Sequence, residues 1–446
     1  MAGKAMTEGS PIKHIVKFAL PVFLGGVLQQ LYNTVDTIVV GNFAGEDSLA
    51  GVGTTSTITF LFVALAMGFA NGNGVLVAQY FGAKDEKRMR RAASTGIILL
   101  MGLGLLGVIF GNVLALPIFK YFVKAPDGVV GYAVSYFKIY AWGLIFQFGY
   151  NIFSSLLRAV GDSSATMWFL LISSVLNVAL DLLFVATFNM GVNGAAIATV
   201  ISQAASFIAA LVYMLKKYPI FRFKLSELKL DGKMAGRTFT IGLPMTMQLI
   251  IVSVGLTFIM RAVNSFGETM TASFTVGNRI EMYLNLPCNA LQTTMATYTG
   301  QNIGAGKPDR VKKGAWQSCA LSLGLSMVIA VAIWINADAI ISLFGISEAA
   351  AFYCIQHIRS IALINLILSA YIPLFGVFQG SGHAIFPMVV ALSALTIRVT
   401  VTYLFRYSDF LGYRIVWMNG MFGFAIGCTI SWTLFLSGRW LKKSSR

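Results

Sequence analysis

The sequence predicts an all-α integral membrane protein with twelve transmembrane helices in two pseudo-symmetric six-helix lobes. Three observations predict this fold class. Hydrophobic residues make up 57% of the chain and charged residues only 11%, with a mean hydropathy of +0.75, whereas a soluble domain carries about 25% charged residues. Twelve apolar stretches are each long enough to cross a hydrocarbon core of about 30 Å as a helix. The second half of the chain also repeats the first.

The apolar stretches are too long for the strands of a membrane β-barrel, which alternate in segments of about ten residues. Helices are therefore the predicted spanning elements. The stretches cover 15–40, 55–81, 92–117, 130–157, 165–187, 192–215, 238–262, 270–300, 315–343, 352–379, 387–406 and 413–437.

The internal repeat is clearest where an apolar stretch gives way to basic sequence. Gln79–Ala83 and Gln301–Ala305 share the pattern Gln-x-x-Gly-Ala, lie 222 residues apart and are each followed by a charged run. Gly161 pairs with Gly382, and Gly191 with Gly412, at an offset of 221. Duplicated helical bundles of this size are typical of transporters, in which the two copies enclose a substrate cleft. We therefore expect an amino-terminal lobe (1–215), a cytoplasmic linker (216–237) and a carboxyl-terminal lobe (238–446).

The charge distribution predicts the orientation in the membrane. The net charge is +16, and 24 of the 33 Lys and Arg residues fall on the side that holds the amino terminus, against five on the other side. By the positive-inside rule, both termini are cytoplasmic in a multi-pass protein of the cell membrane. The basic excess is thus explained by topology and by contact with membrane lipids, and no nucleic-acid partner is expected.

Three acidic residues lie well inside predicted spans: Asp36, Asp181 and Glu281. A charge at mid-membrane costs about 2.5–3.5 kcal/mol on insertion scales, so each is a candidate functional residue. Helical rise places Asp36, Asp181, Asn177 and Thr199 in one layer of the outer half of the first lobe. Such a layer could bind a proton, or Na⁺ through its carboxylate, amide and hydroxyl oxygens. Which way these side chains face does not follow from depth.

Other residues of the first and seventh spans are candidates for the cleft or for hinges. Pro21 and Pro244 occupy equivalent places in the repeat, where proline removes a backbone donor and promotes a kink. Gln29, Tyr32 and Asn33 lie within two turns of the first aspartate and are substrate-cleft candidates.

The second lobe does not copy the acidic layer. Arg398 stands where the repeat would place an asparagine, and Thr402 where it would place an aspartate. Glu281 and Arg398 could form an ion pair, with Arg279 close by in sequence. A structural pair and a substrate contact both remain open.

No catalytic or metal constellation is expected, and no cofactor. The histidines, His14, His357 and His383, have no spacing that suits a metal or a nucleophile. The four cysteines lie in apolar stretches without a close pair, which favours buried free thiols.

Several motifs together resemble those of the multidrug and toxic compound extrusion (MATE) transporters, over roughly residues 17–440. They are Pro21 with Asp36 and Gly41, the Gln-x-x-Gly-Ala pair, the Arg158–Asp162 loop with its weaker counterpart Gln379–Gly382, and Gly191–Ala196. The resemblance implies a monomer of two six-helix lobes that exports small organic cations, such as drugs and dyes, by alternating access in exchange for H⁺ or Na⁺. It also implies a cation site at Asp36, Asn177, Asp181 and Thr199. Some relatives carry a further carboxylate on the seventh helix, and residues 238–262 have none.

Three alternatives compete with cation export. A major facilitator-type transporter also has twelve helices, and Gly82–Arg88 resembles its loop signature. A lipid-linked oligosaccharide flippase shares the MATE architecture and needs cationic cavity residues, which Arg279 and Arg398 could supply. A receptor or scaffold without transport is disfavoured, because intramembrane charge would then be retained at a cost without a use.

Overall fold

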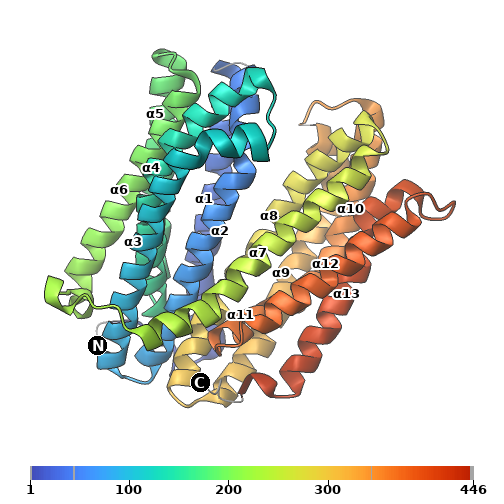
Figure 1. The fold of residues 1–446 in the computed structure, drawn as a ribbon. Coiled ribbons are helices and arrows are strands. Elements are labelled where there is room, and N and C mark those ends of the chain that lie inside the picture. The colour runs from blue at the N-terminus through green and yellow to red at the C-terminus, as the bar shows by residue number, and fades with distance from the viewer. Residues whose placement is uncertain (1–2, 44–45, 343, 442–446) are drawn as a thin grey trace. The chain divides into compact units, whose positions relative to one another are not determined.

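The computed structural model describes residues 3–43, 46–342 and 344–441, and over these ranges the chain is helical, with no strand. The described residues form thirteen α-helices, joined by short turns except for the longer connection between α6 and α7 (Figure 1). Their bounds are α1 Pro11–Phe43, α2 Glu46–Gly82, α3 Glu86–Pro117, α4 Asp127–Ala159, α5 Ser163–Asp181, α6 Gly191–Lys217, α7 Gly232–Asn264, α8 Glu268–Gly304, α9 Pro308–Ser342, α10 Glu348–Ser369, α11 Ile372–Gly380, α12 Ile385–Phe405 and α13 Ile415–Leu436. Single π-helical turns extend α3 and α5, at Ile118–Phe122 and Leu182–Thr187.

The twelve expected spans are confirmed as long helices. Helices α10 and α11 form one span, Glu348–Gly380, interrupted by a short break. Within the part of the chain that the structure describes, eleven spans are long and apolar enough to cross a membrane. The remaining helix, α8, is 37 residues long, the same length as α2. It is less hydrophobic because it carries charges and amides, including Arg279, Glu281 and Asn285.

The repeat recurs in the backbone. Four pairs of residues with positive φ lie 221 or 222 residues apart, each in a connection between helices or at the first residue of a helical element. They are Lys84 (57°) with Gly306 (70°), Lys124 (54°) with Gly345 (61°), Gly161 (89°) with Gly382 (92°), and Gly191 (54°) with Gly412 (49°). Two of these pairs are the glycines whose spacing predicts the repeat. The two halves therefore share their turn geometry as well as their helix order.

The chain divides into two compact units. Unit 1 comprises Met1–Ala5 and Leu20–Thr246, and unit 2 comprises Met6–Ala19 and Met247–Arg446. Along the chain the division falls inside α7 and not at the 216–237 linker. In unit 1, the first half of α7 packs closely on α2: a Cβ added to Gly72 would lie 2.7 Å from the Cα of Gly242. This close backbone approach explains why the start of α7 belongs to unit 1.

In unit 2, the segment before α1 is held by the turn between α8 and α9. The Met6 backbone N–H donates to Gln301 Oε1 at 2.8 Å, and Lys307 Nζ donates to the Thr7 carbonyl at 3.0 Å. Arg310 donates to the carbonyls of Met6, Glu8 and Gly9. The second copy of the repeated motif thus binds the amino-terminal segment.

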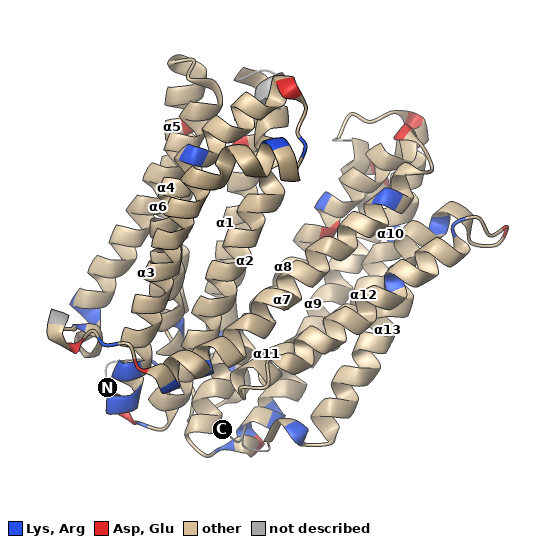
Figure 2. Cartoon of the chain, in the orientation of Figure 1, with Lys and Arg blue, Asp and Glu red and all other residues tan. Residues whose placement is uncertain are grey.

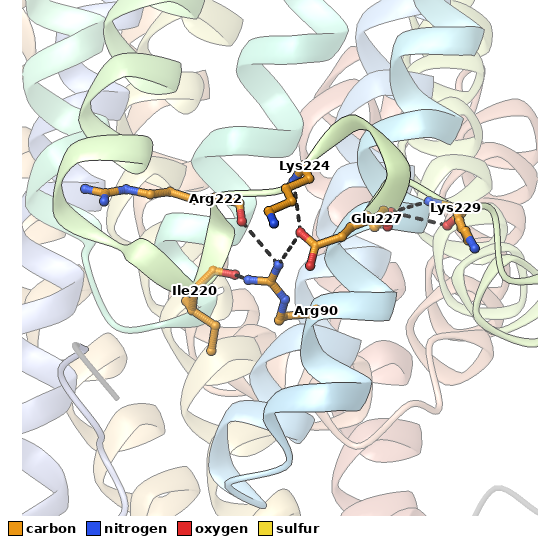
Figure 3. A network of polar contacts seen from close by, with 7 residues as sticks. Arg90, Ile220, Arg222, Lys224, Glu227 and Lys229 are labelled. Carbon is orange, nitrogen blue, oxygen red and sulfur yellow. Dashed lines mark hydrogen bonds and ion pairs between the residues drawn. The ribbon is translucent and has the colours of Figure 1, made fainter.

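The connection between α6 and α7 is ordered by α3, as Figure 3 shows. Arg90 donates to the Ile220 carbonyl at 2.5 Å, the Arg222 carbonyl at 3.1 Å and Glu227 Oε2 at 2.9 Å. The Lys224 backbone N–H also donates to Glu227 Oε2, at 2.9 Å. These contacts, with the backbone N–H of Lys224 foremost, hold the pKa of the Glu227 carboxyl below its ordinary value.

Basic residues of unit 1 gather at the end of its helices where this connection lies (Figure 2). The Arg90 network and the basic run that precedes it are part of that end. The helices α1 and α7 continue without interruption through Pro21 and Pro244. Helix α9, in contrast, has a non-helical residue at Asn336.

Candidate functional site

Three helices of unit 1 carry the predicted cation-coupling residues. Asp36 lies on α1, Asn177 and Asp181 lie one turn apart on α5, and Thr199 lies on α6. Helix α1 approaches α5 closely at Gly25, where an added Cβ would lie 3.3 Å from Leu170 Cδ1. The contact lies about three helical turns from Asp36 along α1 and from Asp181 along α5.

The structure brings the two aspartates together. Asp181 is fully buried, Asn177 is 1% exposed and Thr199 is 6% exposed. The Asp36 and Asp181 carboxyl groups lie within hydrogen-bonding reach of each other. Both oxygens of Asp181 and the Oδ1 of Asp36 are buried, and no donor among the described residues hydrogen-bonds to them. Two carboxylates can only accept hydrogen bonds, so a proton or a cation held between them would satisfy the pair.

Asn177 and Thr199 complete this cluster of oxygens. Neither Oδ1 nor Nδ2 of the buried Asn177 has a hydrogen-bond partner among the described residues. The Thr199 hydroxyl donates to the Ala195 carbonyl at 2.9 Å, which leaves its lone pairs free to accept. Carboxylate, amide and hydroxyl oxygens of this kind suit a small hard cation as well as a proton.

Three tyrosines border the acidic pair. The Tyr32 side chain, one turn before Asp36, lies within hydrogen-bonding reach of Thr199. Tyr136 and Tyr140 of α4 stack with ring centroids 6.2 Å apart, and Tyr136 lies close enough to both aspartates to interact electrostatically with them. Sequence reasoning missed these two α4 tyrosines. The signal that could have found them is a pair of tyrosines four residues apart, which places both hydroxyl groups on one face of the helix.

The other first-span candidates are placed differently. Gln29 and Asn33 are exposed on α1 and make no side-chain hydrogen bond in the described part of the chain. The Tyr32 side chain is the cleft candidate that reaches the acidic cluster, and it does so through Thr199.

The suggested ion pair of the second lobe is not formed. Arg398 Nε donates instead to Asn419 Oδ1, at 2.7 Å. Glu281 lies within hydrogen-bonding reach of Asn285 and interacts with Arg398 electrostatically, without a direct contact. The pair fails because Asn419, on α13, lies nearer to the guanidinium than Glu281 on α8 does. Arg279 is exposed.

His357 is a core residue of unit 2. Its ring lies between Phe274 and Trp417, with centroid distances of 5.0 Å and 5.5 Å and nearly parallel planes. A Cβ on Gly277 would lie 2.1 Å from its Nδ1, so this glycine makes room for the ring. In the described part of the chain, no group of three or more His, Cys, Asp or Glu side chains could hold a metal ion.

The Arg158–Asp162 loop is a structural hub of unit 1. Asp162 is 2% exposed and accepts hydrogen bonds from the Tyr218 hydroxyl at 2.7 Å, the Tyr213 hydroxyl at 2.9 Å and Lys217 Nζ at 3.0 Å. Burial of this carboxyl group favours a higher pKa, but the three donors outweigh burial and hold the pKa below its ordinary value. The motif thus joins the α4–α5 turn to the end of α6.

Comparison with protein families gives one consistent result. The MatE family model matches residues 21–183 and 244–404, one match in each half of the repeat. These matches cover most of the chain and include Asp36, Asn177 and Asp181 in the first half.

Curated relatives match along nearly the whole chain. A probable multidrug resistance protein of Bacillus subtilis, YpnP, is 29% identical over 435 residues, which is 97% of each protein. A probable multidrug resistance protein of Thermotoga maritima, NorM, is 24% identical over 97% of this chain and 94% of its own length.

Solved structures agree in fold. A MATE crystallised in complex with MaL6 superposes with a TM-score of 0.92 at 25% identity, covering 98% of this chain and 99% of its own. A transporter from Pyrococcus furiosus, described as having a binding pocket of reverse polarity, superposes with a TM-score of 0.91 at 25% identity, covering 98% of each chain. These matches set aside the major facilitator alternative.

Proposed function

Because the chain belongs to the MatE family of transporters, we propose that it is a secondary active antiporter that exports small amphipathic organic cations in exchange for H⁺ or Na⁺. The named multidrug resistance relatives support the substrate class. The coupling ion would enter the first lobe, at the cluster formed by Asp36, Asn177, Asp181 and Thr199.

One observation carries this proposal: two neighbouring carboxyl groups lie inside the membrane-spanning part of the chain without a donor between them. Retaining two unsatisfied acids there costs free energy. A proton shared by Asp36 and Asp181, or a sodium ion held by both, removes the repulsion between them. Such an ion stabilises the pair when it binds, and an antiporter would bind it on one side of the membrane and release it on the other.

The neighbours of the pair suit this exchange. Tyr32 lies within hydrogen-bonding reach of Thr199, a member of the cluster, and the buried Tyr136, which stacks on Tyr140, lies close to both aspartates. Low surrounding polarity strengthens the response of the pair to the loss or gain of one charge. Binding of the ion would then favour one arrangement of α1 against α5, and its release the other.

We further propose that the protein lies in the cell membrane as a monomer with cytoplasmic termini and contacts anionic lipids through its basic end. The distribution of 24 Lys and Arg on one predicted side against five on the other supports this orientation.

Transport by reconstituted protein tests the function. Purified protein in liposomes, given an imposed pH gradient without sodium, should export a fluorescent organic cation. Asp36→Asn should abolish the efflux, whereas Asp309→Asn, at a largely exposed residue of α9, should leave it intact. A sodium gradient in place of the pH gradient identifies the other coupling ion. If the wild type moves no dye under either gradient, cation antiport is wrong.

A lipid-linked oligosaccharide flippase is the second candidate function. One observation favours it: Arg398, a cation inside a membrane-spanning helix, has no direct acidic partner. Flipping of a fluorescent pyrophosphate-linked lipid in the same liposomes, lost in Arg398→Gln and unaffected by Asp36→Asn, would support it over cation antiport.

A further inference from the structure

Arg398 is held in a fixed position in unit 2. Its Nε donates to Asn419 Oδ1 at 2.7 Å, and Asn419 is itself fully buried and anchored to the Ile415 and Val416 carbonyls. Its guanidinium carbon lies 5.0 Å from the centroid of the Phe424 ring. A Cβ on Gly423 would lie 2.4 Å from Arg398 Cγ, so a glycine on α13 makes room for the side chain.

Most of the donors of this guanidinium are unused. The Nε group has its partner in Asn419, whereas neither Nη group donates a hydrogen bond to any residue that the structure describes. The Arg398 side chain is half-buried, so the described residues do not enclose it completely. A guanidinium presents a planar fork that matches a carboxylate or a phosphate. The two Nη groups of Arg398 are the free part of this fork.

Among the described residues, no acidic side chain directly contacts the Arg398 guanidinium. Glu281 acts on it only from a distance and lies within reach of Asn285 instead. Tyr371 also interacts with Arg398 electrostatically, and it packs against Gly427, where an added Cβ would lie 2.8 Å from the tyrosine hydroxyl. The charged fork therefore lies near the aromatic ring of Phe424, a surface suited to the apolar part of an amphipathic compound.

We propose that Arg398 binds an acidic group, a carboxylate or a phosphate, of an amphipathic compound that the protein transports. The site belongs to unit 2, whereas the acidic cluster belongs to unit 1, and it gives the protein a second class of substrate beyond simple cations. This inference rests on the proposed function as a transporter. A cation inside a membrane span costs about 2.5–3.5 kcal/mol on insertion scales, and its direct pairing with an anionic ligand offsets that cost.

A second expectation concerns the effect of Glu281 on anion affinity. Its negative charge opposes the approach of an anion to Arg398, so its neutralisation should strengthen anion binding. A compound that also carries a positive charge would respond in the opposite way, because it would lose an attraction.

The test is equilibrium binding to the full chain in lipid nanodiscs, measured by calorimetry with 1-naphthoate, 1-naphthyl phosphate and the cation 1-naphthylmethylammonium. Arg398→Gln should weaken binding of the two anions by about tenfold or more, which is the size of a charge-assisted contact, and leave the cation unchanged. Arg398→Lys should restore part of the affinity, and Glu281→Gln should raise the affinity for both anions. Arg279→Gln, on the exposed side of α8, should change nothing.

Equal anion affinities in the wild type and Arg398→Gln would overturn the proposal. If Arg398→Gln weakened binding of the cation as much as binding of the anions, the proposal would also be wrong, because that result would indicate a structural role. Tighter binding of phosphate than of carboxylate would indicate phosphorylated substrates, and the reverse would indicate carboxylic acids. Because binding is measured without a gradient, it can succeed when cation efflux fails. Failure of the antiport proposal and failure of this one are thus distinguishable.

Discussion

The Tyr218 hydroxyl donates a 2.7 Å hydrogen bond to the buried carboxylate of Asp162, across the junction between the α4–α5 turn and the end of α6. Lys217 and Tyr213 bind the same carboxylate oxygen, while its other oxygen accepts from the Ala165 backbone N–H at the start of α5. The Asp162 side chain therefore joins the start of α5 to the end of α6. Since hydrogen bonds to a charged group are worth about 1.5–3 kcal/mol each, this residue should matter for stability.

Asp162→Asn should destabilise the protein by about 2 kcal/mol, because the amide keeps the cap but loses the charge that three donors share. The measurement is thermal unfolding in detergent, followed by tryptophan fluorescence. Asp309→Asn is the matched control, since Asp309 is exposed and its ion pair with Lys312 is a surface pair worth little. An equal effect of both substitutions would contradict the role of Asp162.

The same difference should depend on pH in one direction. The pKa of Asp162 is held below its ordinary value, so its contribution is fully present above the ordinary aspartate pKa of about 3.9 and is lost as the pH falls through the lowered value. The gap in melting temperature between wild type and Asp162→Asn should be constant from mildly alkaline to mildly acidic pH and shrink only in strong acid. A gap that closes near neutral pH would show that another group is responsible.

Asp36→Asn should raise the thermal stability of the protein while it abolishes pH-driven transport. The amide removes one of two neighbouring charges and supplies the donor that the Asp181 carboxylate lacks, a contact worth about 1 kcal/mol or more. A loss of stability would indicate that Asp36 holds the fold together and that no repulsion is relieved.

Much of the architecture could be predicted from the sequence. Repeated glycines at one offset predicted the turns that recur between the halves, because positive φ is a local requirement that glycine meets best. The acidic layer could be predicted by depth, because helical rise is constant.

The facing of side chains could not be predicted, because it depends on how helices pack. Tyr136 and Tyr140 were therefore missed. An ion pair of Glu281 with Arg398 and a substrate contact both remained open, whereas in the structure Arg398 Nε donates to Asn419. The unit boundary inside α7 was also missed, since it follows from the contact of Gly72 with Gly242, which only the folded chain brings together.

That helix contact provides a fourth prediction. Gly72→Ala should destabilise unit 1 by about 1–3 kcal/mol, because the new methyl group would meet backbone atoms of Gly242 that cannot move aside. Gly102→Ala on α3, where an added Cβ meets nothing within 4 Å, should be neutral or stabilising by up to about 1 kcal/mol. Thermal unfolding of the two variants compares them directly. Similar changes in both would show that α2 and α7 do not pack as closely as described.

The linker provides the last prediction. Arg90→Ala should release the 218–231 connection, because Arg90 supplies the donors that hold the Ile220 and Arg222 carbonyls and the Glu227 carboxylate together (Figure 3). Limited digestion with trypsin, with the fragments identified by mass spectrometry, should then cut after Arg222 and Lys224 several times faster than in the wild type. Arg90→Lys should restore little of the protection, since an ammonium group cannot bridge several acceptors with the geometry of a guanidinium. Arg91→Ala removes a neighbouring exposed charge and should leave the cleavage rate unchanged. Equal rates in Arg90→Ala and the wild type would mean that the α3 contact does not order the connection.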